Sequence, residues 1–179
     1  MIIIKNKVCD NPIPREELLK NIVIGKTSYD DTQDIITILS NCFNVNSEAE
    51  ILLQLLNSLA DLENSVKVID ERNGDIYGLL IFSKFNITQG SPIMFINPSL
   101  GNDLSSLKQI NGYSFILDER LRNTNIDKKM LLYNKEYIDQ FDMVWCGVDK
   151  SLKSHNYWKR LGFEEVLNIY DAIFYVKYL

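Results

Sequence analysis

The most constraining feature of this sequence is a continuous apolar run at Met143–Val148. An uninterrupted run of this length is typical of a strand buried on both faces, whereas a half-exposed strand alternates apolar and polar residues. A helical pattern precedes the run, and a strand pattern at Tyr113–Leu117 precedes that helix. Strand, helix and strand in this order form a crossover unit, which places two parallel strands in one sheet. We therefore expect an α/β fold with a mixed sheet.

The other elements are predicted from periodicity and turn signals. Two capping-box pairs, Ser28 with Asp31 and Ser47 with Glu50, each begin an amphipathic helix. The dipeptide Asn73-Gly74 accepts positive φ and predicts a hairpin. The predicted elements are strands at Ile22–Gly25, Val66–Val68, Ile76–Ser83 and Ile93–Ile96, a helix with apolar positions from Ile126 to Ile138 after an N-cap at Asn125, a helix at Ser151–Leu161, and two strands within Val166–Tyr178. We expect about seven mostly antiparallel strands, with the fourth and fifth parallel, and four helices.

Length and hydrophobicity set the domain organisation. A chain of 179 residues with 46% hydrophobic residues suits one domain with one core. We expect a single domain over residues 1–179, with an N-terminal extension at 1–19 and an insertion at 84–109. Apolar stretches are far shorter than the roughly 20 residues that cross a bilayer, and Met1–Val8 does not resemble a signal peptide. A cytoplasmic protein with no membrane contact is expected.

Charge and cysteine content exclude several classes of site. The net charge of −5 argues against a nucleic-acid partner. The segment Arg120–Arg160 nevertheless carries +4 and the rest −9, so an anionic ligand would be attracted to this segment unless its charges are merely solvated helix faces. The three cysteines are widely spaced and fit reduced core thiols, and a single histidine argues against a zinc site.

The predicted helix at Ser151–Leu161 ends in Gly162-Phe163. Glycine can take the left-handed position that caps a helix, and the phenylalanine returns the chain to the core. The run Asn156–Phe163, placed after a buried strand and before a terminal hairpin, resembles the Tyr-x-x-x-Gly-Phe run of the GNAT superfamily of N-acetyltransferases. The order of elements is similar too, over roughly Ile22–Leu179. The resemblance implies that acetyl-CoA is the acyl donor.

The resemblance also implies a phosphate-binding loop before the crossover helix. Arg122 matches the first position of the family's Gln/Arg-x-x-Gly-x-Gly/Ala motif, whereas Asn125 and Asp127 stand at its two small-residue positions. Asparagine tolerates positive φ, so we expect Asn123 and Asn125 to keep the turn, while Asp127 would repel phosphate. An ordinary Asn-capped helix without a ligand is the alternative. The implied acetyl-CoA-binding residues are Phe115, Ile116, Leu117, Arg122, Asn123, Thr124, Asn125, Ile126 and Trp158.

Two side chains are candidates for acid–base catalysis. Glu119, at the end of the fourth strand with Asp118, could take a proton from an amine, although the alternative that both are turn carboxylates in solvent is favoured. Trp158 stands where the family commonly has a tyrosine that protonates the departing thiolate, and indole cannot supply that proton. The adjacent Tyr157 is the remaining candidate, but one residue on a helix is about 100° of rotation.

Two other reactive side chains are interpreted as structural. Cys146 lies on the predicted fifth strand, near where the resemblance places the thioester, and is expected to be a small buried residue. His155 is expected to be packed or at the surface rather than to be a general base.

Three functions fit these observations. The first is transfer of an acetyl group from acetyl-CoA to a primary amine, with a small-molecule acceptor. The second is a GNAT-like protein that binds CoA as a sensor or regulatory module with little or no transfer. The third is a non-catalytic interaction domain. The sequence leaves the identity of the acceptor and a homodimer open.

Overall fold

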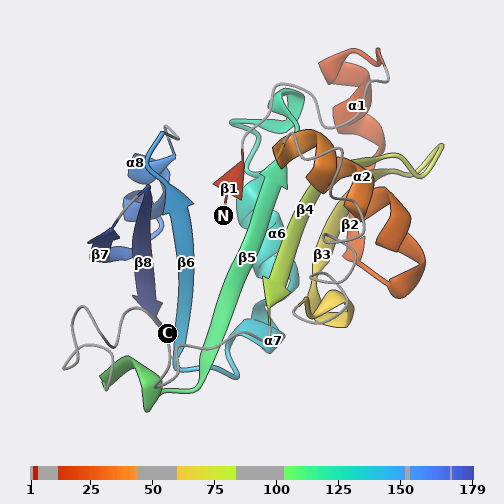
Figure 1. Ribbon diagram of the computed structural model, residues 1–179. Helices are drawn as coiled ribbons and strands as arrows, with labels where there is room; N and C mark the ends of the chain where they lie inside the picture. Colours follow the sequence, from red (N-terminus) through yellow and green to blue (C-terminus); the bar gives the residue numbers. More distant parts are fainter. Residues whose placement is uncertain (1, 4–11, 44–59, 84–102, 152–153, 170) are drawn as a thin grey trace.

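Within the described residues, eight strands form one mixed sheet (Figure 1). The computed structural model describes residues 2–3, 12–43, 60–83, 103–151, 154–169 and 171–179. The strands are β1 (Ile2–Ile3), β2 (Ile22–Lys26), β3 (Val66–Asp70), β4 (Ile76–Ser83), β5 (Gln109–Leu117), β6 (Met143–Asp149), β7 (Glu164–Ile169) and β8 (Ala172–Tyr178). Their order is β2-β3-β4-β5-β6-β8-β7, with β1 paired to β5 outside this path. The β5–β6 and β1–β5 pairs are parallel, so the predicted mixed sheet with a parallel pair is confirmed.

Helices pack on both faces of this sheet. They are α1 (Arg15–Asn21), α2 (Thr32–Phe43), α6 (Ile126–Tyr133), α7 (Lys135–Ile138) and α8 (His155–Arg160), with 3₁₀ turns η1 (Tyr29–Asp31), η2 (Leu62–Asn64) and η3 (Glu119–Leu121). Among the described residues, no helix combines the length and the apolar character that crossing a membrane requires.

Strand β4 lies at the centre of the core, and every one of its residues is buried. Its side chains divide between two clusters. Tyr77 and Phe82 pack with Met130 of α6 on one face, whereas Leu79 and Ile81 pack with the apolar stripe of α2 on the other. This division explains why Ile76–Ser83 has a nearly continuous apolar sequence, since a central strand covered on both faces buries all of its side chains.

Three local predictions are confirmed by the structure. The carboxylate of Asp31 accepts a hydrogen bond from the Ser28 N–H at 2.7 Å, which is the return bond of a capping box at the start of η1 and α2. Gly74 in the β3–β4 turn has φ of +80°, and Gly162 after α8 has φ of +84°. Phe163 is buried, as expected for the residue that returns the chain to the core.

Several boundaries differ from the prediction. The helix predicted from Ile126 to Ile138 is interrupted at Asn134, whose side chain bonds to Lys26 and to the carbonyl of Asn64. The last helix begins at His155 rather than at Ser151, whose N–H donates to the Asp149 carboxylate in a turn. Strand β5 begins at Gln109, and α1 was not predicted. The helix begun by Ser47, the strand at Ile93–Ile96 and most of the insertion lie outside the described residues.

Candidate active site

Strands β5 and β6 are paired at one end only. Their parallel register joins Gln109–Asn111 to Met143–Trp145, and the pairing then stops although β5 continues to Leu117. The Asn111 side chain donates from Nδ2 to the Trp145 carbonyl oxygen at 3.3 Å, at the last pair of this register. Beyond Asn111 the two backbones separate, and β6 keeps its pairing with β8 along its whole length. We call this region the β5–β6 splay.

The chain's own first strand enters the splay. Ile2 pairs with Phe115 and Ile3 with Ile116 in parallel register. Figure 1 shows β1 beside β5 on the side that faces β6. The backbone edge of Phe115 and Ile116, which the sequence assigned to the acyl donor, is therefore engaged by residues 2–3 in this structure.

A tight turn connects the end of β5 to α6. After Asp118 and η3, residues 122–125 turn back, with φ of 59° at Asn123 and 62° at Asn125. This confirms the prediction that these two asparagines adopt the left-handed conformation in which glycine is usual. Thr124 Oγ1 donates to the Leu121 carbonyl and closes the turn.

The turn leads directly into the N-terminus of α6. Asn125 occupies the N-cap position, as predicted, but its side chain makes no capping hydrogen bond. The first N–H groups of a helix have no partner within the helix, and the helix dipole favours an anion there. Lys128 and Lys129 are exposed in the first turn of α6. The first N–H groups of α6, the helix dipole and the two lysines together make this end of the helix suitable for a phosphate group.

Aromatic side chains of α8 pack against β5. The rings of Phe115 and Tyr157 are stacked, with centroids 6.3 Å apart and planes inclined by 27°. Trp158 contacts Phe115 edge-on at 6.3 Å and Phe163 at 5.0 Å. Trp158 is only 5% exposed, so it forms part of the core, whereas Tyr157 is half-buried next to β5.

The Tyr157 hydroxyl lies near the start of α6. Burial raises the pKa of this hydroxyl well above its ordinary value, and the negative charge of the nearby Asp127 raises it further. Asp127 is half-buried in the first turn of α6, close enough for its charge to act on this hydroxyl. A hydroxyl with a raised pKa stays protonated at neutral pH but is a weak acid.

The two carboxylates at the end of β5 have different surroundings. Asp118 is fully buried, and its two oxygens accept from Arg120 Nε at 2.8 Å and Nη2 at 3.0 Å. Such a paired carboxylate is a structural anchor. Glu119, the proposed base, is exposed on η3 at the end of β5.

Cys146 and His155 are part of the packing. The Cys146 thiol is 2% exposed, and burial raises its pKa to about 12, so it is not a thiolate at neutral pH. His155 approaches the Tyr175 hydroxyl at 3.0 Å through Nδ1 and the Lys150 carbonyl at 3.3 Å through Nε2. The burial of Cys146 and the two contacts of His155 agree with the interpretation of both residues as structural.

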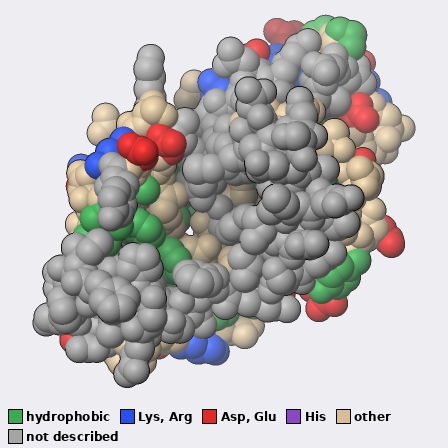
Figure 2. Space-filling view, in the orientation of Figure 1, with side chains coloured by type: hydrophobic (Ala, Val, Ile, Leu, Met, Phe, Trp, Pro, Cys, Tyr) green, Lys and Arg blue, Asp and Glu red, His purple; other side chains and the backbone are tan. Residues whose placement is uncertain are grey.

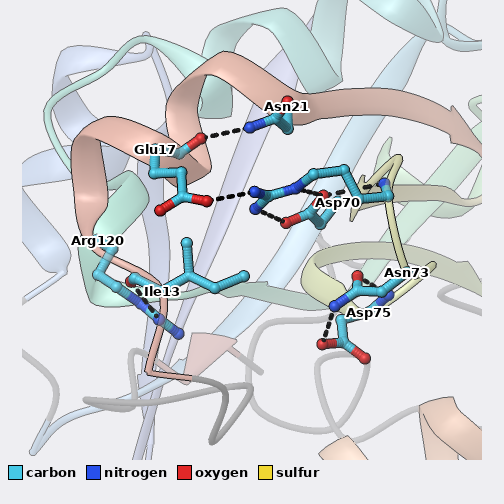
Figure 3. A network of polar contacts seen from close by, with 8 residues as sticks. Ile13, Glu17, Asn21, Asp70, Asn73, Asp75 and Arg120 are labelled. Atoms are coloured by element: carbon cyan, nitrogen blue, oxygen red, sulfur yellow. Dashed lines mark hydrogen bonds and ion pairs between the residues drawn. The ribbon is translucent and has the colours of Figure 1, made fainter.

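An arginine pair attaches residues 13–21 to the ends of strands β3 and β5, beside the site. Arg120 Nη1 donates to the Ile13 carbonyl at 3.2 Å, and Arg72 contacts Glu17 of α1 at 2.5 Å (Figure 3). Arg15 donates to the Arg122 carbonyl at 3.0 Å, which joins α1 to the turn before α6. Segment 12–21 is thus anchored next to the predicted phosphate loop.

Sequence reasoning missed this anchor, although a signal was present. The tripeptide Asp-Glu-Arg occurs at Asp70–Arg72 and again at Asp118–Arg120, each time at the end of a strand. In both copies the arginine folds back on a fully buried aspartate. The run Pro14-Arg15-Glu16-Glu17, with proline and acidic residues at a helix start, also indicates α1.

The segment Arg120–Arg160, with its net positive charge, is not a uniform positive surface. Acidic and basic side chains lie side by side over α8 in Figure 2, and Lys159 of α8 pairs with Glu165 of β7 at 3.5 Å. The attraction for an anion therefore depends on the turn and the start of α6 rather than on the segment as a whole.

Comparison with known proteins identifies the class of fold. No protein-family model and no curated protein matches the chain. Three solved structures that match illustrate the likeness. Arabidopsis thaliana NAA60 in complex with a bisubstrate analogue has a TM-score of 0.63 and 16% identity, over 88% of this chain and 99% of that one. Thermoplasma volcanium Ard1 has a TM-score of 0.61 and 15% identity over 89% and 98%, and the PaiA N-acetyltransferase of Thermoplasma acidophilum in complex with coenzyme A has 0.59 and 11% over 88% and 99%. The chain has the GNAT fold.

Proposed function

We propose that this protein is an N-acetyltransferase that binds acetyl-CoA at the β5–β6 splay and acetylates a small-molecule primary amine. The observation that carries the proposal is the turn at residues 122–125, where two asparagines with positive φ lead into a helix start without a side-chain cap. The GNAT fold of the chain is the second support.

The acyl donor would be held by backbone groups at two places. The pyrophosphate would accept hydrogen bonds from the N–H groups that follow Asn123, including that of Ile126, with Arg122 as the nearby cation. Thr124 closes the turn that directs these groups. The amides of the pantetheine arm would pair with β5 at residues 115–117, as an added strand pairs with a sheet edge.

The proposed reaction is a direct attack. The amine nitrogen attacks the thioester carbonyl carbon, the C–S bond breaks, and the thiolate leaves while the new ammonium loses a proton. Glu119, through water, is the proposed acceptor of that proton. Tyr157 is the proposed donor to the thiolate, and its raised pKa makes it a weak one. Most of the rate would come from positioning the two substrates.

A second candidate function is binding of CoA without efficient transfer. It is favoured by the surroundings of two residues of α8. Trp158 is buried in the core, and the adjacent Tyr157 hydroxyl is kept protonated by burial and by the charge of Asp127. Both candidates require the same binding site and differ only in turnover.

Two measurements test the proposal. Acetyl-CoA should raise the thermal midpoint, because a ligand that binds only the folded state stabilises it. Arg122→Ala should weaken acetyl-CoA about tenfold in calorimetry, whereas Lys135→Ala, which removes one exposed charge on α7, should not. Equal affinity for wild type and Arg122→Ala would refute the phosphate site. Release of free thiol in the presence of a panel of amines then separates transfer from binding alone.

A further inference from the structure

We propose that β1 is a displaceable strand that competes with the acyl donor for the edge of β5. This inference rests on the proposed function, because it takes the donor to bind at the same edge. It assigns a regulatory role to the first strand of the N-terminal extension.

The register of β1 carries the argument. The two residues of β1 pair with Phe115 and Ile116, inside the part of β5 that β6 has left. Without β1, the N–H and C=O groups there would form an open strand edge, which is a template for any extended chain with amide groups. The pantetheine arm has two amides and satisfies that description. One edge cannot pair with both partners at once.

The pairing is short enough to be reversible. A strand of two residues makes few ladder hydrogen bonds, and each contributes little net stability because water replaces it when it opens. The rest of the sheet does not depend on β1, since β5 is also held by β4 from Gly78 to Ser83. Displacement of β1 therefore leaves the pairing of β4 with β5 intact.

Anchoring by α1 keeps the competing strand close to the site. Leu18 of α1 is fully buried in the core, and Arg15 bonds to the carbonyl of Arg122. A segment tethered next to its binding site re-forms an intramolecular contact at high effective concentration. The same anchor joins α1 to the turn that would hold the pyrophosphate, so residues 2–3 contact one part of the donor site and Arg15 contacts the other.

Competition lowers the apparent affinity for the donor. Only the fraction of molecules with β1 displaced can bind, so the apparent dissociation constant rises by the inverse of that fraction. Ile2→Pro with Ile3→Pro removes both N–H donors of β1 and should free the edge. Ile2→Ala with Ile3→Ala retains both donors and is the matched control.

The experiment is calorimetry of acetyl-CoA with the full chain and these two double variants. The proline variant should bind about tenfold more tightly than wild type, with the alanine variant closer to wild type. Amide exchange of peptides covering Phe115 and Ile116, measured without ligand, should be faster in the proline variant alone. This second measurement reports on β1 docking even where no ligand binds.

The outcomes are distinct. Equal or weaker binding by the proline variant, with wild type binding, would overturn the competition while leaving the proposed function in place. Unchanged amide exchange in the proline variant would also overturn it, because β1 would then not protect the edge. If none of the three proteins binds acetyl-CoA, the proposed function fails and this inference fails with it.

Discussion

The ring of Tyr157 is stacked on that of Phe115, with centroids 6.3 Å apart. This contact fixes the ring on β5 while burial and Asp127 keep the hydroxyl protonated. Tyr157→Phe keeps the stack and removes the hydroxyl, so acetyl-CoA affinity should be unchanged. Turnover should fall less than about tenfold, because water can protonate a thiolate leaving group. A loss of a hundredfold or more in kcat would show that Tyr157 is a much stronger acid than its surroundings indicate.

Asp127 is predicted to weaken binding of the acyl donor. Its carboxylate stands in the first turn of α6, where the proposed site takes a pyrophosphate. Asp127→Asn removes the charge with little change in shape and should tighten acetyl-CoA about two- to fivefold in calorimetry. Asp127→Gly should act in the same direction. Unchanged or weaker binding by both variants would mean that the carboxylate does not oppose the phosphates.

Asn125 should be replaceable by glycine but not by alanine. Its φ of 62° is costly for a residue with a Cβ that cannot bond locally. Asn125→Ala should lower the free energy of unfolding by about 1 kcal/mol, whereas Asn125→Gly should leave it nearly unchanged. Urea unfolding measures both. An equal loss of unfolding free energy in the alanine and glycine variants would show that the turn needs the asparagine side chain rather than a residue that tolerates the left-handed backbone.

Asp70 should make stability depend on pH in acid. Hydrogen bonds from Arg72 lower the pKa of this buried carboxyl in the folded protein. The unfolded chain therefore binds a proton first as pH falls, and stability is lost from about pH 4 downward through the folded pKa. Thermal midpoints of wild type should fall more steeply below pH 4 than those of Asp70→Asn. Asp30→Asn, at an exposed carboxylate, is the control, and an identical slope for wild type and Asp70→Asn would contradict the account.

Periodicity and turn chemistry predicted most of the central sheet. The parallel pair followed from the apolar run at Met143–Val148, and the left-handed backbone at Asn123 and Asn125 followed from the tolerance of asparagine for positive φ. These features depend on local sequence, which is why they could be predicted. The motif at Gly162-Phe163 could be recognised for the same reason.

Features that depend on distant contacts were missed. The break at Asn134 results from bonds to Lys26 and Asn64, which no helical pattern records. The position of β1 depends on the separation of β5 from β6, and a run of isoleucines does not specify which strand it will join.

Amide hydrogen exchange with and without acetyl-CoA tests the central claim most directly. Binding at the splay should slow exchange in peptides covering Gly112–Leu117 and Arg122–Lys128, and should leave α2 at Thr32–Phe43 unchanged. Acetyl-CoA that binds but protects other segments, with no change at the start of α6, would contradict the proposed site.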